Sequence, residues 1–327
     1  MKMPTSAELG GIHPRSEQLI ELTRSYDRGK TERASVEKQI ELDTIELVKL
    51  QDESGFENFT DGAFSWQDQF RPVVESLDGI TTGTRYSRWF DTNTFYKKPT
   101  VNGKIGLALF DTKKFIRTDL LPKSETWKVS LVGPYTFSEL AENLHYKTQS
   151  DLVSDLALAE HEIIQRLKAD GVSQFQISEP CLVYRPYREQ ALSNAELEIA
   201  LATLRGTVEG IDARFTVQTY FGDATTILPY LLKLPVDGIG FDLFETDPTR
   251  SKIETKKTLA LGIVDSRESN IEDPRWIAET ATRVSKHIFS DNVVLVPNSD
   301  LKFVPRKVAD AKSRVLAEAA RLVEERK

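Results

Sequence analysis

Residues 258–265 read TLALGIVD, a short apolar run that ends at the carboxylate of Asp265. An uninterrupted apolar run of this length is typical of a strand that is buried on both faces of a sheet. Similar runs recur along the chain, and polar or turn-forming residues follow each of them. We expect strands at 56–60, 127–132, 172–178, 214–219, 238–243, 258–264 and 293–296.

Segments with a helical spacing of apolar residues separate most of these runs. Ser193 and Glu196 have the spacing of a capping box, which marks the start of one helix. This alternation predicts βαβ units in the α/β class, and we expect a single (β/α)8 TIM barrel over residues 1–327. A doubly wound open sheet is the alternative, but the chain lacks the glycine-rich phosphate loops that would favour it. We expect helices at 34–53, 152–167, 193–206, 225–232, 275–288 and 308–322.

The stretch around 80–125 does not follow the alternation, and it predicts an extended insertion into the barrel. We find no internal repeat, no low-complexity segment and no linker rich in Gly, Pro or Ser. One compact domain is therefore the simpler interpretation.

Composition excludes several classes of protein. Lys and Arg total 43 against 50 for Asp and Glu, and this net charge of −7 with no basic block argues against a nucleic-acid binder. No apolar run is long enough for a membrane span, and residues 1–5 contain no apolar core of a secretory signal, so we expect a cytoplasmic protein. A single cysteine excludes an internal disulfide and a Cys-rich zinc site, and no histidine has a second His or the Cys at metal-ligand spacing.

In a (β/α)8 barrel, the loops at the C-terminal ends of the strands form the site. Glu179 ends one predicted strand, where a rigid and partly desolvated carboxylate is suited to bind an ammonium group or act as a base. The alternative is that Glu179 caps the next helix or pairs with Arg185. Cys181 is either a nucleophile or, as we favour, a small buried thiol. Other polar residues at strand ends are Asp61, Asp223, Asp242, Asp265 and Ser299.

Two further segments carry candidate binding groups. Residues 89–93 read WFDTN, and their aromatic and polar side chains suit stacking on a flat ring and hydrogen bonding to it. The alternative, favoured on chemistry alone, is a turn anchored by two buried aromatic residues. Arg15 follows a glycine–proline turn and has the geometry to hold a carboxylate or phosphate, although a solvated arginine is the simpler interpretation.

Several segments together resemble the cobalamin-independent methionine synthases. Those zinc enzymes transfer a methyl group from methyltetrahydrofolate to homocysteine, and they contain two related (β/α)8 barrels of which only the C-terminal one carries zinc. The matching segments run in order from about 11 to 305 and look more like the N-terminal barrel. They are residues 11–15 (G-F-P-R in the family), 89–93 (W-F-D-T-N), 132–137 (I-G-P-x-T-F), 176–180 (Q-I-D-E-P), 219–222 (T-Y-F-G), 234–238 (L-P-V-x-G) and 261–265 (L-G-V-V-D).

The chain departs from the catalytic barrel at the zinc site. In the alignment that the resemblance implies, the family's His, Cys, Glu and second Cys ligands fall on Thr219, Phe221, Asp242 and Ser299. One carboxylate and neutral hydroxyls do not make a tetrahedral nitrogen and sulfur site. Ser178 also replaces the Asp that helps to hold the homocysteine amine. We therefore expect no metal in this chain, and zinc in a partner chain.

The resemblance leaves three interpretations of function. In the first, the chain is the N-terminal-like subunit of a split methionine synthase, with Arg15 a candidate contact for the glutamates of a folate donor; a methylated corrinoid is the other candidate donor. In the second, it is a free-standing, zinc-independent enzyme of the superfamily; a uroporphyrinogen-type decarboxylase is a remote variant of this. In the third, it is a non-catalytic partner. An open polar pocket at the strand ends would support the first two, and a mouth filled by Trp89, Tyr220 and Phe221 would support the third.

No residue is firmly assigned to catalysis. The residues that we expect to bind a substrate are Arg15, Trp89, Asp91, Asn93, Glu179, Tyr220, Asp242 and Asp265.

Overall fold

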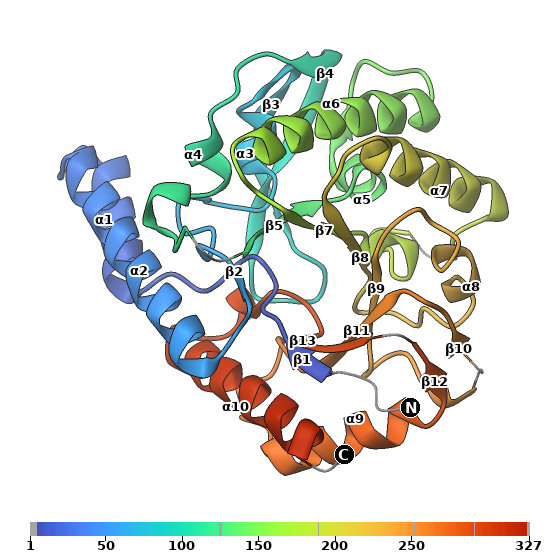
Figure 1. The fold of residues 1–327 in the computed structure, drawn as a ribbon. Coiled ribbons are helices and arrows are strands. Elements are labelled where there is room, and N and C mark those ends of the chain that lie inside the picture. Colours follow the sequence, from blue (N-terminus) through green and yellow to red (C-terminus); the bar gives the residue numbers. More distant parts are fainter. Residues whose placement is uncertain (1–4, 124–125, 189, 251–252, 291, 326–327) are drawn as a thin grey trace.

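The computed structural model describes residues 5–123, 126–188, 190–250, 253–290 and 292–325 (Figure 1). Its main sheet has eight parallel strands that follow one another in chain order, and β1 pairs with β13, so the sheet curls into the predicted (β/α)8 barrel. The strands are β1 (Thr5–Ala7), β2 (Asn58–Phe59), β5 (Thr126–Val132), β7 (Gln174–Ser178), β8 (Arg214–Gln218), β9 (Gly238–Asp242), β11 (Thr258–Val264) and β13 (Asn292–Pro297).

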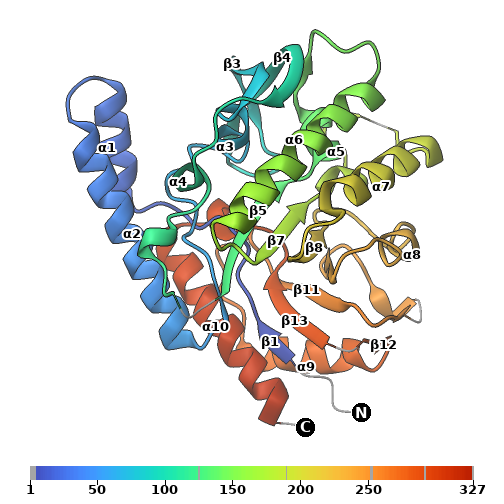
Figure 2. The ribbon, with the colours of Figure 1, turned by 45° about the horizontal axis from the view of Figure 1, so that its top comes forward.

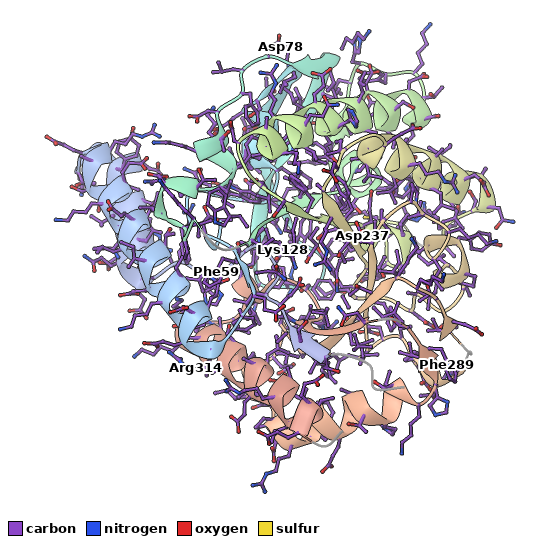
Figure 3. The ribbon with its side chains drawn as sticks, in the orientation of Figure 1. Phe59, Asp78, Lys128, Asp237, Phe289 and Arg314 are labelled. Carbon is purple, nitrogen blue, oxygen red and sulfur yellow. The ribbon has the colours of Figure 1, made fainter. Side chains whose placement is uncertain are left out.

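Hydrogen bonds outside the strand ladders join β1 to β2, the neighbours that close the barrel. Asn58 Nδ2 donates to Glu8 Oε1 over 2.7 Å, and Thr60 Oγ1 donates to the Gly11 carbonyl over 2.9 Å. Lys128, labelled near the centre of Figure 3, forms a 3.1 Å ion pair with Glu8. These contacts hold the loops after β1 and β2 side by side.

Helices lie outside the strands, as Figure 2 shows for α6, α7 and α10. The predicted helices are found, and the Ser193–Glu196 capping box at the start of α7 is present. α2 ends where Gly55 adopts a φ of 78°, which glycine takes up easily. The helices are α1 (Glu17–Asp27), α2 (Arg33–Ser54), α3 (Arg71–Val74), α4 (Thr112–Phe115), α5 (Pro134–Leu140), α6 (Gln149–Ala169), α7 (Asn194–Val208), α8 (Leu228–Leu231), α9 (Pro274–Ser285) and α10 (Arg306–Glu325).

The insertion predicted around 80–125 is largely a β-hairpin. β3 (Leu77–Arg88) and β4 (Phe95–Leu107) pair antiparallel, and β4 also pairs with β6 (Glu142–Asn143). The hairpin lies beside α6 at the outside of the barrel (Figure 1). Its turn, residues 89–94, brings the WFDTN segment back to the barrel mouth. The short strands β10 (Ile253–Glu254) and β12 (Ile288–Phe289) form a separate parallel pair.

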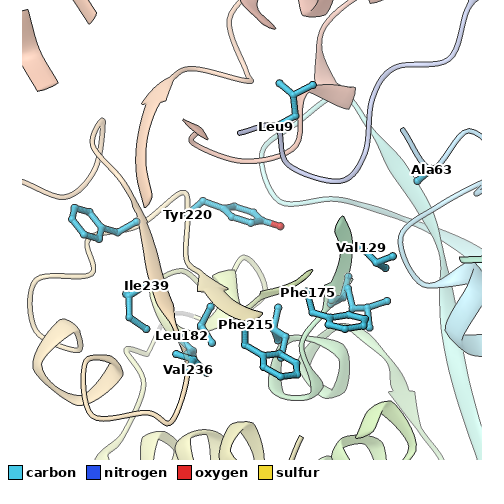
Figure 4. Close-up of a cluster of buried hydrophobic side chains, with 14 of the residues drawn as sticks. Leu9, Ala63, Val129, Phe175, Leu182, Phe215, Tyr220, Val236 and Ile239 are labelled. Atoms are coloured by element: carbon cyan, nitrogen blue, oxygen red, sulfur yellow. The ribbon is translucent and has the colours of Figure 1, made fainter. Parts of the chain in front are cut away.

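The hydrophobic core fills the barrel and the layer between strands and helices. Phe175 and Phe215 stack with their ring centroids 5.6 Å apart, and the cluster in Figure 4 continues upward to Tyr220 and Leu9. None of the helices in the described ranges is long and apolar enough to cross a bilayer.

Candidate functional site

Aromatic side chains fill the barrel mouth beyond β8. Tyr220 and Phe221 follow this strand, and their ring centroids are 4.7 Å apart. Phe90, from the hairpin turn, lies 6.3 Å from Tyr220 and 5.8 Å from Phe221, and Trp89 packs on it at 5.1 Å. These four rings are at most 7% exposed, and Figure 4 shows the Tyr220 ring lying across the barrel interior.

Two of these rings are carried by strained backbone. Phe221 and Phe90 have φ values of 67° and 47°, a left-handed region that L-residues with side chains rarely adopt. Aromatic packing around them stabilises this conformation. We refer to Trp89, Phe90, Tyr220 and Phe221 as the aromatic plug.

The WFDTN segment forms an anchored turn. Trp89 and Thr92 are buried, and Thr92 Oγ1 donates to the Trp89 carbonyl over 2.6 Å. Asp91 and Asn93 are exposed, and Asp91 accepts a hydrogen bond from the Tyr184 hydroxyl. The geometry favours the structural interpretation of this motif over a ring-binding one.

The four residues at the family's zinc positions do not fit a metal. Thr219 donates to the Gly240 carbonyl over 3.3 Å, and the Phe221 ring offers no donor atom. Asp242 accepts hydrogen bonds from the backbone of Phe221 and Phe244 at 3.2 and 2.9 Å. Burial raises the pKa of Asp242 to about 6, which disfavours its charged form. Over the described part of the chain, no three His, Cys, Asp or Glu side chains gather as a metal site.

Asn298, which follows β13, is the centre of a buried polar network at this edge. Its Nδ2 group donates to Asp242 and Asp265, both over 3.2 Å, and its Oδ1 atom accepts from the Ser266 hydroxyl over 2.8 Å. Ser266 also contacts Ser299, with their hydroxyl oxygens 2.6 Å apart. The polar groups at the ends of β9, β11 and β13 are therefore bonded to one another.

Glu179 is fully buried, and it binds the backbone at the start of α5. Its two carboxylate oxygens accept from the Tyr135 and Thr136 amides at 3.0 and 2.7 Å. Burial raises the pKa of Glu179 to about 7, although these hydrogen bonds oppose the shift. Arg185 pairs with Glu196 at 2.8 Å instead. Glu179 therefore caps α5, an earlier helix, and neither caps the next helix nor pairs with Arg185, as the structural alternative expected. Its carboxylate oxygens are held by the backbone, which favours a structural role over binding an ammonium group or acting as a base.

Cys181 is 1% exposed, and burial raises the pKa of its thiol. The environment is that of a small buried thiol and not that of an activated nucleophile.

Two cavities share Arg15 in their lining, and the first of them lies beside the aromatic plug, where Lys302 reaches the Trp89 ring. The first, which we call the mouth pocket, has a volume of about 680 Å³ and is walled by the loops after β1, β2 and β13. Its size falls within the range of about 300–1,000 Å³ that is typical of small-molecule sites. Its lining includes Ile12, Pro14, Trp66, Lys302 and Val304.

The second cavity, which we call the basic groove, has a volume of about 930 Å³ and lies between α2, α3 and α4. Seven Lys or Arg side chains line it against four carboxylates, an excess of three positive charges. The cations are Arg15, Arg33, Lys38, Arg71, Lys113, Lys114 and Arg117.

Arg15 lines both cavities, so the structure places this predicted residue at a site that is open to a ligand. Burial lowers the pKa of Arg15 to about 10, and its guanidinium donates to the Trp66 carbonyl. The structure does not bring the other expected binding residues to either cavity: Trp89, Asp91, Asn93, Glu179, Tyr220, Asp242 and Asp265 line neither.

Sequence reasoning missed most of the cavity lining. Lys302 lies three residues beyond Ser299, in the loop that follows β13. A search for polar residues a little further past the end of this strand would have found it. The cations of the basic groove carry no such signal, because they come from separate loops and helices.

Comparison of the sequence with models of known protein families gives a match. The sequence model described as the cobalamin-independent synthase, N-terminal domain, matches residues 80–288. The chain belongs to this family. The cobalamin-independent synthase match confirms the resemblance noted in the sequence, including its N-terminal character.

Relatives of known name agree with this family. The chain is 27% identical over 304 residues to a methionine synthase of Sulfolobus acidocaldarius, covering 91% of this chain and 86% of that protein. It is 26% identical to a methionine synthase of Saccharolobus islandicus, covering 96% and 93%.

Solved structures confirm the fold. A B12-independent methionine synthase from Shewanella sp. W3-18-1, in complex with selenomethionine, aligns with a TM-score of 0.80 at 18% identity and covers 100% of this chain and 99% of that one. A methyltransferase from Methanosarcina mazei aligns with a TM-score of 0.60 at 14% identity, covering 97% and 93%.

Proposed function

We propose that this chain takes part in methyl transfer to homocysteine as the zinc-free, N-terminal-like barrel of a two-chain methionine synthase. Its family and the names of its relatives support the reaction class. The side chains at the zinc positions support a separate metal-bearing chain, because Thr219, Phe221 and Ser299 supply no zinc-binding nitrogen or thiolate. The partner that we propose is a separate, zinc-bearing chain that activates homocysteine.

The observation that carries this proposal is the basic groove. The whole chain has a net charge of −7, yet the groove has an excess of three positive charges. A local positive surface attracts a polyanion even when the rest of the protein is acidic. This charge favours a folate donor with a glutamate tail over a methylated corrinoid as the groove's ligand.

Two cations of the groove, Arg33 and Lys114, pair with carboxylates near the surface and are available for such a ligand. Arg33 pairs with Glu37 at 3.2 Å, and Lys114 pairs with Glu75 at 3.7 Å, but all four side chains are at least 32% exposed. Exposed ion pairs contribute little free energy, so a ligand carboxylate can replace the protein carboxylate without a large penalty.

Folates that differ only in tail length test the groove directly. Calorimetry on the purified chain should find the triglutamate form of methyltetrahydrofolate bound at least about tenfold more tightly than the monoglutamate form at low salt. The difference should shrink at high salt, because salt screens exposed charges. Arg15→Met and Arg117→Met should reduce it, whereas Lys233→Met, outside the groove, should not. Equal affinity for the two forms at low salt would contradict the proposal.

A non-catalytic, regulatory partner is the second candidate, and the aromatic plug favours it. Trp89, Tyr220 and Phe221 fill the part of the mouth where the catalytic barrel of the family would hold its metal. The two candidates differ in one respect: a subunit is required for turnover by the zinc-bearing chain, and a regulator only changes its rate.

A free-standing enzyme has less support. The strand-end acids Glu179, Asp242 and Asp265 are bonded within the protein, and none of them lines either cavity.

A further inference from the structure

Lys302 is the uncommitted cation of the mouth pocket. Its side chain reaches the pocket from the loop between β13 and α10, with Nζ 6.0 Å from the centre of the Trp89 ring. Among the residues that the structure describes, its ammonium group has no hydrogen-bond or ion-pair partner. Burial lowers the pKa of Lys302 to about 8, as expected for an amine that has lost water without gaining a carboxylate.

The two acids whose charges act on Lys302, Asp300 and Asp68, are engaged elsewhere. Asp300 accepts from the amides of Gly11 and Ile12 at 2.9 and 3.1 Å. Asp68 accepts from the Phe70 amide at 3.0 Å and pairs with Arg71 at 3.3 Å. Neither carboxylate is within ion-pair distance of Lys302, so the pocket holds a cation without its counterion.

The other cations of the pocket already have partners or face solvent. Arg306 pairs with Asp310 at 3.0 Å, and Arg15 donates to the Trp66 carbonyl. Lys307 is exposed at the rim. A ligand anion that enters the pocket therefore meets Lys302 as its strongest unused donor.

The remaining pocket walls are largely apolar. They suit a hydrocarbon body more than a second charge, since burying a charge away from a partner is costly. Their apolar side chains are Ile12, Pro14, Ile20, Ala63, Trp66, Val304 and Pro305.

We propose that the mouth pocket binds a small organic monocarboxylate with an apolar body, and that the Lys302 ammonium group pairs with its carboxylate. The ligand's carboxylate supplies the missing counterion, and its body displaces water from the apolar walls. This site is separate from the binding of a folate tail in the basic groove, and its test uses no methyl donor. The two proposals can therefore fail independently.

The probe for this site is 3-phenylpropionate, and the matched neutral control is 3-phenylpropionamide. Calorimetry should detect binding of the acid, and the amide should bind at least about tenfold more weakly. This difference is the effect of one charge-assisted hydrogen bond. Lys302→Met should reduce the affinity for the acid by a similar factor and leave the affinity for the amide unchanged. Lys302→Arg should retain most of the affinity, and Lys286→Met, an exposed lysine remote from the pocket, should retain all of it.

Amine labelling followed by peptide mass spectrometry gives a second readout that needs no variant. At ten times its Kd, 3-phenylpropionate should slow the labelling of Lys302 by about tenfold and leave exposed lysines unaffected. Equal protection by the acid and the amide, or none by either up to about 10 mM, would overturn the proposal, because even a millimolar site would then be mostly occupied. Failure of Lys302 to label in the free protein would also overturn it, because the amine would then not face an accessible pocket.

Discussion

Glu179 accepts two backbone hydrogen bonds at the start of α5 while it is completely buried. The sequence could predict that a carboxylate would end this strand, because the stretch before Glu179 and Pro180 reads as a strand. It could not predict the carboxylate's partner, because Tyr135 and Thr136 lie more than 40 positions away in the chain. The same holds for Asp242, whose partner Asn298 comes from another βα loop.

The raised pKa of Glu179 gives a prediction about pH. The folded protein keeps this proton up to about pH 7, whereas the unfolded chain releases it near the ordinary glutamate pKa of 4.5. Between these values the folded state binds the extra proton, so stability falls as pH rises through this window and is level above it. Glu179→Gln has no carboxyl to titrate at this position. The free energy of unfolding of the variant relative to wild type should therefore rise by up to about 3 kcal/mol between pH 4.5 and pH 7.

Urea unfolding of both proteins across this pH range measures the difference. Burial raises the pKa of Asp242 in the same direction in both proteins, so that contribution cancels in the comparison. Parallel stability profiles for wild type and Glu179→Gln would show that the Glu179 carboxyl is not perturbed by its surroundings.

At the scale of elements, the strands and helices of the barrel are well predicted, and the β3–β4 hairpin is not. The barrel strands are apolar runs with clear ends, whereas β4 contains Pro99 and several lysines, which are uncommon in strands. Only three residues form β1, too few for any periodicity to be detected. The hairpin still matters for the site, because its turn delivers Trp89 and Phe90 to the aromatic plug.

Gly79 tests the geometry of this hairpin. It has a φ of 77° at a register shift between β3 and β4, and a Cβ atom there would lie 2.2 Å from the Lys104 carbonyl oxygen. Gly79→Ala should therefore destabilise the protein by at least about 2 kcal/mol and reduce hydrogen-exchange protection along the hairpin.

Gly106, in the same hairpin, is the matched control. A Cβ atom at Gly106 would contact nothing within 4 Å, so Gly106→Ala should change stability by no more than about 0.5 kcal/mol. Equal effects of the two substitutions in urea unfolding would contradict the hairpin geometry described above.

At the scale of the whole molecule, the barrel brings together charges that are far apart in sequence. The basic groove combines cations from α2, α3 and α4 and the loops beside them, and no stretch of the sequence is strongly basic. Arg15 could be predicted because it follows a recognisable turn and matches a family motif. Arg71 and Arg117 could not, since only the packing of α2 against the loops after β2 and β4 places them beside it.

The aromatic plug and the basic groove together support one role for the whole molecule. The groove is the cationic surface that we propose for a donor, and no cluster of three metal-binding side chains occurs in the part of the chain that the structure describes. Such a barrel should contribute to methyl transfer only when another chain supplies the metal.

The most direct test is to quantify zinc in the purified chain and to assay homocysteine methylation with and without a zinc-bearing homologue from the same cell. We expect no bound zinc, no activity of the chain alone, and activity in the mixture that neither protein has by itself. Activity of the homologue alone, merely altered in rate by this chain, would instead identify a regulator. Stoichiometric zinc together with activity of the chain alone would contradict the two-chain proposal.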